Sequence, residues 1–594
     1  MEDKKLKLLL GLISIVSILT VYLSSKDLML LLSPLSVKAT YKLEFNSRIR
    51  LEETYNYQIK RNYKYRMLYR FWEEPLSFQE RLNRPFLLLE DASGFPFWYA
   101  KDYKGFIEGK FPPSALPLIR KLAQRNELGL VKPSYFKKGE YKLTASYLIF
   151  PPVEFLKNLS HVNLKLADFH APYKEVLIFI YDPESRVKEI YPHFPYYQIK
   201  RLGDGFLIDG YSPENSILGV ELLLKGKVDG FLHECPDLTF RVKSANLFSH
   251  FAHKLWIFLL WFGRVVLISL PLVLLYIYYN FGKEKKFVVP SFLSFVPNPD
   301  RPPWFVNLVF TGDAFEGDEN AFFATILDFY RRGIIDIEGD KIILKGGSLK
   351  DPYEKKVYFI LRRLSKEEGG NLVFKPEYVE ELKNKEPERL KFLKGEINLL
   401  LNYKNPVVSV QFVDDRGARV VKGLLSVSFS ITFFLFIVFS FEKRVFFYTF
   451  DIYPFVVLFS GFTFALFLAS LLPTQFFGRW KENYYLERLQ WEAFKNFLSD
   501  LAAIKKYAPQ DISIWKEWLV YGTALGVADK VIEAMRELKV ELPEVQKIDA
   551  LRGQFKVSYL ILNSLASDLS SVSSASGGSF GGGGGFGGGG AGGR

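Results

Sequence analysis

Four apolar runs, each long enough to cross a lipid bilayer, constrain this chain more than any other feature. They cover residues 6–23, 256–281, 423–441 and 452–472. A transmembrane helix needs about 20 predominantly apolar residues. The third run carries no charged residue, and its connection to the fourth is so short that the two are predicted to form a helical hairpin. The chain is therefore predicted to be an integral membrane protein with three or four transmembrane helices.

The first two runs each leave a question. The first follows Lys4 and Lys5, and within residues 1–33 it is either a cleaved signal peptide or a retained signal anchor. The second contains Arg264. At mid-bilayer an arginine costs roughly 2.5–3.5 kcal/mol, whereas each Leu, Ile, Phe or Val returns about 0.3–0.6 kcal/mol. The run contains enough of these apolar residues to outweigh the arginine, so it is still predicted to span the membrane.

Basic residues near the ends of the runs predict the orientation, because cytoplasmic loops are enriched in Lys and Arg. Most of them lie on one side if the N-terminus is cytoplasmic, whereas Lys443 and Arg444 in the hairpin loop oppose that orientation. Residues 38–254 are then expected outside the plasma membrane, and residues 283–422 and the C-terminus in the cytoplasm. The supporting residues are Lys4, Lys5, Lys283, Lys285, Lys286, Arg416, Arg419, Lys422, Arg479 and Lys481.

Residues 38–250 are predicted to form an extracytoplasmic β-rich domain. Residues 41–60 alternate apolar or aromatic side chains with charged ones, which is the pattern of half-buried strands. Later aliphatic runs are short and are bounded by Gly, Pro, Asn or Asp. We predict a sandwich-like fold, interrupted by a helical stretch near residues 116–130. The only cysteine of the chain, Cys235, excludes an intramolecular disulfide.

All six histidines lie in or just beyond this domain, which raises the hypothesis of a metal site. Neither candidate spacing matches a closed zinc site, and one candidate pair lies almost at the membrane. Ser, His and Asp also occur, but no nucleophile-elbow motif indicates a hydrolase. The sequence therefore predicts no metal ligand, no cofactor and no catalytic residue. The candidates considered are His233 with Glu234 and Cys235, and His250 with His253.

Residues 283–422 are predicted to form a cytoplasmic α+β module. Residues 321–332 have helical spacing, and two short strands, 334–337 and 341–344, follow them. A helix followed by a hairpin is typical of the last part of a winged-helix domain. The net charge of the chain is +13, but the basic residues of this module are too few to indicate DNA binding. No nucleic-acid partner is expected.

Residues 476–563 are predicted to form a cytoplasmic helical domain. An amphipathic helix covers about 482–507 and ends at Pro509, and a helix that is apolar nearly all round covers 513–535. In the second helix, Trp515, Tyr521, Gly522 and Gly526 are the candidate residues for helix packing or for a partner surface. The Ser/Gly-rich tail, residues 564–594, cannot bury a core and is predicted to be disordered.

Several sequence segments, taken in order, resemble the YciQ-like family of predicted membrane proteins, known as domain of unknown function 2207. The resemblance rests on Pro302-Pro303, ATILDFYRRGIIDI, the late helical hairpin, FGRW, and the block that runs from WEAFKNFLSD to DKVIEAM, followed by the Gly-rich terminus. The outer domain up to about residue 142 matches the pattern poorly. The resemblance implies no assigned reaction and no catalytic residues.

Three hypotheses of function remain open at this point. The leading one is a membrane-anchored interaction or scaffold protein, which would link recognition at the cell surface to unidentified protein partners in the cytoplasm. The second is an accessory subunit of a transport or secretion assembly. Only Arg264 and Asp451 are ionisable near the membrane core, so a lone transporter is not expected. The third is an outward-facing hydrolase, although an enzyme is the less favoured class.

Overall fold

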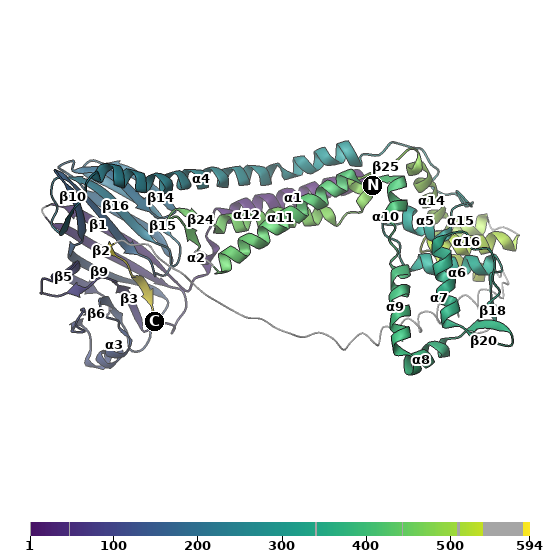
Figure 1. Ribbon diagram of the computed structural model, residues 1–594, viewed down its shortest axis with the longest axis horizontal. Helices are drawn as coiled ribbons and strands as arrows, with labels where there is room; N and C mark the ends of the chain where they lie inside the picture. The colour runs from purple at the N-terminus through teal and green to yellow at the C-terminus, as the bar shows by residue number, and fades with distance from the viewer. Residues whose placement is uncertain (1, 47, 339–340, 442–443, 508–510, 539–585) are drawn as a thin grey trace. The chain divides into compact units, whose positions relative to one another are not determined.

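The computed structural model describes residues 2–46, 48–338, 341–441, 444–507, 511–538 and 586–594 (Figure 1). The chain divides into two compact units. The helical unit combines residues 1–13, 271–427 and 465–576, and the β unit combines residues 14–270, 428–464 and 577–594. Each unit is described by itself below.

Three sheets make up most of the β unit. The first has the order β14 (Tyr196–Leu202), β15 (Gly205–Ser212), β12 (Tyr173–Tyr181), β1 (Leu35–Phe45), β2 (Ile49–Ile59), β9 (Gly139–Phe150), β5 (Phe86–Gly94) and β4 (Leu76–Ser77). The second has the order β13 (Val187–His193), β16 (Leu218–Lys225), β11 (Leu159–Ala167), β10 (Pro152–Leu156) and β17 (Phe231–Glu234), with β26 (Phe586–Gly587) beside β11. The third has the order β27 (Gly590–Gly593), β3 (Met67–Phe71), β8 (Glu127–Val131), β6 (Trp98–Lys101) and β7 (Ile107–Lys110).

One hydrophobic core joins the three sheets. Strands β1 and β2 form an antiparallel hairpin in which Thr40 lies opposite Thr54. Every second side chain of these strands is buried, because successive residues of a strand point to opposite faces. Buried side chains of the other two sheets, such as Leu164, Leu222 and Leu128, belong to the same cluster. The predicted β-rich character of this region is confirmed.

The predicted helical stretch near residues 116–130 is wrong in its second half. A short 3-10 helix, η1 (Pro113–Ala115), leads into α3 (Leu116–Leu122), which ends at Ala123 where the backbone becomes extended. Strand β8 follows and is buried along its whole length. Its apolar residues pair with β3 and β6, and this pairing overrides their helix propensity.

Among the residues that the structure describes, four helices are long and apolar enough to cross a membrane: Lys4–Ser24, Leu238–Gly282, Arg416–Ser440 and Tyr453–Ser470. They correspond to α1 (Glu2–Ser24), α4 (Leu238–Ile277) with the π-helical turn η2 (Tyr278–Gly282), α11 (Arg416–Phe441) and α12 (Tyr453–Ser470). All four predicted runs are therefore helical. Helix α4 begins well before the predicted start at residue 256. Most residues between the β sheets and that position are therefore already helical.

A short segment follows α1, and a small hairpin separates α11 from α12. The segment contains helix α2 (Leu28–Leu32), which is capped by Asp27. The hairpin consists of β23 (Val445–Phe446) and β24 (Phe450–Asp451). Both lie in the β unit.

The helical unit has a single core that draws on residues from both predicted cytoplasmic modules. Trp304, Phe322 and Val357 of the first stretch and Trp491 and Trp515 of the second belong to one cluster. The two stretches, expected as separate modules, thus fold together. The helices are α5 (Pro303–Phe310), α6 (Glu319–Arg331), α7 (Pro352–Leu364), α8 (Pro376–Lys385), α9 (Pro387–Leu401), α10 (Pro406–Phe412), α13 (Thr474–Phe477), α14 (Tyr484–Ser499), α15 (Leu501–Lys506), α16 (Ile512–Ala524) and α17 (Ala528–Glu537).

The strands of the helical unit are short. One sheet has the order β18 (Ile335–Glu338), β19 (Lys341–Leu344), β21 (Asn371–Phe374) and β20 (Lys366–Glu368). The predicted helix and hairpin are present as α6, β18 and β19, although residues 339–340 of the turn lie outside the described residues. A second sheet pairs β22 (Val413–Asp414) with β25 (Arg479–Trp480). The winged-helix class stays a prediction.

Both long helices predicted after residue 476 are interrupted. The first breaks at Asp500, whose side chain accepts hydrogen bonds from the backbone N–H groups of Ala502 and Ala503 and so caps α15. The second breaks at Gly526, whose φ of 74° ends α16. Pro509, the predicted end of the first helix, lies outside the described residues.

The C-terminal residues differ most from the prediction. Residues 564–585 of the tail lie outside the described residues, but residues 586–594 contain strands β26 and β27 of the β unit. Figure 1 shows these yellow strands among the purple strands of the N-terminal part. The prediction of disorder is therefore wrong for the last nine residues, because unpaired strand edges of the β unit bind their backbone.

Candidate functional site

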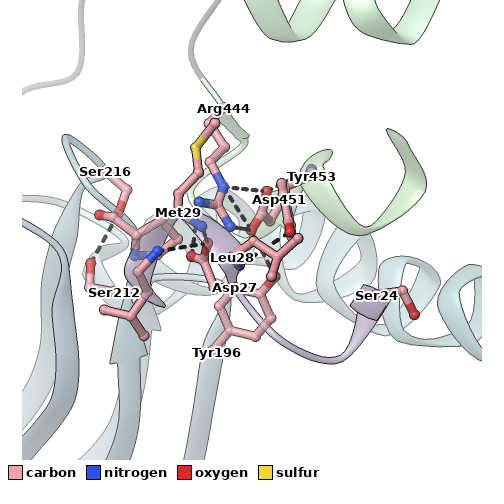
Figure 2. Close-up of polar contacts among 12 residues, drawn as sticks. Ser24, Asp27, Leu28, Met29, Tyr196, Ser212, Ser216, Arg444, Asp451 and Tyr453 are labelled. Atoms are coloured by element: carbon pink, nitrogen blue, oxygen red, sulfur yellow. Dashed lines mark hydrogen bonds and ion pairs between the residues drawn. The ribbon is translucent and has the colours of Figure 1, made fainter. Parts of the chain in front are cut away.

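An ion-pair cluster centred on Arg444 lies where the hairpin between α11 and α12 meets the rest of the β unit (Figure 2). The Arg444 guanidinium contacts the Asp451 carboxylate through two nitrogens, Nε at 3.0 Å and Nη2 at 2.7 Å. Its third nitrogen, Nη1, lies 2.9 Å from the carboxylate of Asp27. The side chains of Arg444 and both carboxylates are almost completely buried.

Hydrogen bonds connect this cluster to β14, α4 and the start of α12. The Tyr196 hydroxyl donates to Asp451 Oδ2 over 2.7 Å, and the Trp256 indole N–H donates to the Asp451 backbone oxygen over 2.8 Å. The Tyr453 hydroxyl accepts the backbone N–H of Leu28 over 3.2 Å. Four segments that are distant in the sequence therefore meet at one buried charge cluster.

Aromatic packing surrounds the cluster and joins the sheet to α4. Tyr196 stacks on Tyr211 with ring centroids 4.0 Å apart, and it contacts Trp256 edge-on at 5.2 Å. His253 stacks on Tyr197 at 4.6 Å. Aromatic pairs of this kind contribute about 0.5–1.5 kcal/mol each beyond the area they bury. The junction is thus held by charge and by apolar contact.

A second polar cluster lies in the β unit around Glu221 of β16. Its carboxylate receives hydrogen bonds from His161 Nε2 at 2.8 Å, from His193 Nε2 at 2.9 Å and from the Asn246 side chain at 2.9 Å. The other ring nitrogen of His161 lies 2.9 Å from the Glu154 carboxylate. Because both nitrogens of His161 face carboxylates, both must donate, and the imidazole is therefore a cation. Asn246 lies on α4, so the cluster joins four strands, β10, β11, β13 and β16, to that helix.

A cavity of about 250 Å³ borders this second cluster. Its lining includes His193, Glu221, Asn246, Lys165 and Tyr448. The His, Glu, Lys and Tyr side chains among them are ionisable and the Asn246 amide is not, and no nucleophile with a base and an orienting group is arranged among these five residues. The arrangement therefore fits a titratable structural junction.

The Glu221 cluster predicts a pH dependence of stability for the β unit. Burial acts to lower the pKa of His161, but its contacts with Glu221 and Glu154 raise that pKa above the ordinary value. Burial acts to raise the pKa of Glu221, but hydrogen bonds from His161 and His193 lower it to about 2. The stability from His161 is present below its unfolded pKa of about 6.5 and is lost as the pH rises through the folded pKa, whereas that from Glu221 is lost only as the pH falls toward 2.

We therefore expect His161→Gln to lower the thermal stability of the full chain in detergent more at pH 5.5 than at pH 8.5. At pH 5.5 the loss should be about 1.5–3 kcal/mol, the range for hydrogen bonds to charged groups. His233→Gln is the matched control, because His233 is exposed on β17. An equal loss at both pH values for His161→Gln would contradict a charged imidazole at this position.

The residues considered as metal ligands are dispersed. His233, Glu234 and His250 are exposed, whereas Cys235 is buried and accepts a contact from Arg241 at 3.0 Å. His253 is buried and bonds the backbone oxygen of Pro195 at 3.1 Å. Within the described residues, no group of three or more His, Cys, Asp or Glu side chains could hold a metal ion.

The four candidate residues of the helical unit lie at helix contacts. Trp515 and Tyr521 are buried, and the Tyr521 hydroxyl donates to the backbone oxygen of Arg301 over 2.9 Å. A Cβ at Gly522 would lie 3.0 Å from Val531 of α17, so glycine permits this close approach. Gly526 forms the turn between α16 and α17. Their use as a partner surface stays a prediction.

The Arg444 cluster was missed from the sequence, and one signal could have found it. Arg444 is a basic residue on the side predicted to be outside, and Asp27 and Asp451 are acids next to predicted membrane spans. Opposite charges at the ends of different apolar runs indicate an ion pair, since unpaired charges there are costly. Arg264, the other ionisable residue noted, lies over the Trp261 ring and contacts Ser24 Oγ at 3.3 Å.

Comparison with protein families supports the resemblance for the C-terminal part. Residues 290–535 match the family model described as the C-terminal domain of a predicted membrane protein, DUF2207. The match begins at Pro290, covers most of the described part of the helical unit and includes α11 and α12. The predicted resemblance is confirmed over these residues. No curated protein matches the chain.

Solved structures give only weak likenesses. An M1 zinc metallopeptidase from Deinococcus radiodurans has 8% sequence identity and a TM-score of 0.17, and the alignment covers 32% of this chain and 42% of that one. The yeast delta-COP-I mu-homology domain has 7% identity and a TM-score of 0.12, with 34% of this chain and 77% of that one covered. The chain thus spans less than half the length of the metallopeptidase. These scores carry no argument about fold or activity.

Proposed function

We propose that the chain is a membrane-anchored interaction protein whose β unit recognises a partner outside the cell and whose helical unit binds a partner in the cytoplasm. The Arg444 cluster is the observation that carries the proposal. It ties the sheet strand β14 to the residues that follow α1, to α4 and to the loop between α11 and α12. A partner that binds the β sheets therefore acts on α4 and on the ends of the other three apolar helices.

The proposed orientation places the β sheets outside and the helical core inside. The main objection to it was the basic residue Arg444 in an outer loop. Lys443 and Arg444 still count against this orientation, but pairing with two buried carboxylates explains how Arg444 is accommodated in that loop. Lys283 and Arg416, at the other ends of α4 and α11, agree with a cytoplasmic helical unit.

The same contacts support α1 as a retained anchor rather than a cleaved signal. A Cβ at Gly461 of α12 would collide with Thr20, which shows that the two helices touch there. Arg264 of α4 contacts Ser24, and Arg444 pairs with Asp27. Removal of residues 1–33 would leave these partners without their contacts. We therefore propose that the N-terminal segment stays in the mature protein.

Proximity labelling from each side of the membrane tests this function. One ligase is fused before Met1, and a second is inserted at Gly203, an exposed position in the turn between β14 and β15. We expect two different, reproducible sets of labelled proteins, each absent from a control in which the ligase is carried by α1 alone. Failure of both ligases to label proteins above that control would contradict the interaction role. A labelled polytopic transporter would instead favour an accessory subunit.

A further inference from the structure

The strand edges that bind residues 586–594 have the properties of a recognition slot. Strand β3 is the end of the third sheet when β27 is left out, so its backbone groups on that side are available to an added strand. Strand β27 pairs with it antiparallel, with Gly590 opposite Phe71 and Gly593 opposite Leu68. Such addition of a strand to a sheet edge is a general mode of peptide recognition.

Backbone contacts hold the added strand along its whole length. The N–H of Gly588 donates to the Lys165 oxygen over 2.6 Å, and the N–H of Ala171 donates to the Ala591 oxygen over 2.8 Å. The Ala591 N–H donates to the Tyr173 hydroxyl over 3.0 Å. The segment is therefore held on both sides, by β3 and by β11 with its following loop.

The slot selects glycine by space and by backbone conformation. A Cβ at Gly590 would collide with the Phe169 backbone oxygen and would lie 2.7 Å from His170 Cβ. Gly588 and Gly589 have φ values of 66° and 74°, which L side chains rarely adopt. Phe586 and Ala591, the two apolar residues of the segment, enter the core of the β unit. A larger side chain at most positions would exclude the segment.

Charged groups at the two ends of the slot match the segment. Arg70, paired with Glu53 in the core, donates to the Gly588 backbone oxygen over 3.2 Å. At the other end the Arg594 guanidinium pairs with the buried carboxylate of Glu127 and lies 4.1 Å from the Tyr69 ring centroid. The Arg594 backbone oxygen accepts the N–H groups of Arg66 and Met67 at 2.7 and 2.9 Å. The slot therefore binds an arginine that follows the glycines.

We propose that this slot is a binding site for a glycine-rich strand that ends in arginine, and that residues 586–594 of the chain itself are its occupant. The proposal rests on the proposed role of the β unit in recognition and names the class of segment that it recognises. It also replaces the predicted cytoplasmic position of the C-terminus, because a docked tail shares the compartment of the β sheets.

A tail that docks on the β sheets must reach the side of the membrane on which they lie. Residues 539–585 contain no apolar run of bilayer length. Polar backbone is tolerated at membrane depth only where protein or water surrounds it. Docking of the chain's own tail therefore requires a protein-lined path to the outer face, and labelling of the tail from each side of the membrane tests this requirement.

Carboxypeptidase B, which removes a terminal arginine, tests the docking in a chain expressed to end at Arg594 and purified in detergent. We expect release of Arg594 at least about 10-fold more slowly than from the free peptide FGGGGAGGR. Gly590→Val should release it at the peptide rate, whereas Gly582→Val, in the part of the tail that the structure does not describe, should match the wild type. Cys235, the single and buried thiol, reports through its reactivity that the β unit of each variant is folded. Equal fast release from the wild type and from Gly590→Val would overturn the site.

Two further measurements keep the proposal testable if a variant misfolds. A chain that ends at residue 585 should bind added FGGGGAGGR with one-to-one stoichiometry and should not bind FGGGVAGGR, and binding of neither peptide would overturn the slot. In intact cells, Gly582→Cys in a Cys235→Ser background should react with an impermeant maleimide from outside. Reaction only after permeabilisation would overturn the chain's own tail as occupant. The proximity labelling above is independent of these results, so either proposal can fail alone.

Discussion

Replacement of Arg444 by glutamine is expected to lower the free energy of unfolding of the β unit by about 3–5 kcal/mol, the range for breaking a buried ion pair. The substitution leaves the carboxylates of Asp27 and Asp451 buried without a cation, and Asp451 is fully buried. Like charges in a medium of low polarity also repel one another. The loss should appear in thermal or denaturant unfolding of the full chain in detergent, followed through the exposure of Cys235.

Two comparisons show whether charge is the cause. Arg416→Gln removes a cation of an exposed pair, with Asp414, and should cost about 0–1 kcal/mol. Adding Asp451→Asn to Arg444→Gln should recover part of the loss, because one uncompensated carboxylate is removed. Asp451→Asn alone also has a cost in unfolding free energy. If the double variant loses the sum of the two single losses, the cluster does not act through charge.

The second large effect is expected for Glu53→Gln, in the core of the β unit. Arg70 and Glu53 are both fully buried, with Nε and Oε2 3.2 Å apart. Glutamine keeps the shape of the side chain but leaves the guanidinium without a counter-charge. A loss of about 3–5 kcal/mol is expected, as for other broken buried pairs. The same thiol reactivity should show that the β unit opens about 100- to 4,000-fold more often, since each 1.4 kcal/mol is a factor of ten.

The adjacent residue supplies the control for this variant. Glu52 on the same strand pairs with Lys42 on the surface, at 3.5 Å. Glu52→Gln should therefore change the unfolding free energy by no more than about 1 kcal/mol. Similar losses of unfolding free energy for Glu52→Gln and Glu53→Gln would show that the buried pair stabilises the β unit no more than the exposed pair does.

The long apolar helices and the β-rich character could be predicted because both depend on local pattern. Residues 423–441 and 452–472 are apolar throughout, and the alternation in residues 41–60 is that of β1 and β2. Length and periodicity alone decide such features. The same reasoning found α6, β18 and β19 within a residue or two.

Features that depend on distant partners could not be predicted in this way. Residues 127–131 read as part of a helix, and they form a strand only because β3 and β6 pair with them. The glycines of residues 587–590 are predicted to be disordered, since nothing in their own sequence indicates that they pair with the edge of β3. Arg444 meets Asp27 across more than four hundred residues of sequence. Contacts of this range have no local signal in one sequence.

The central claim is that the β sheets and the helical core lie on opposite sides of a membrane, and sided cysteine labelling tests it most directly. Gly203 of the β unit and Gly395 of the helical unit are both exposed, and a Cβ at either meets nothing within 4 Å. In a Cys235→Ser background, Gly203→Cys is expected to react with an impermeant maleimide on intact cells, and Gly395→Cys only after permeabilisation. Reaction of both cysteines from the same side would contradict the account.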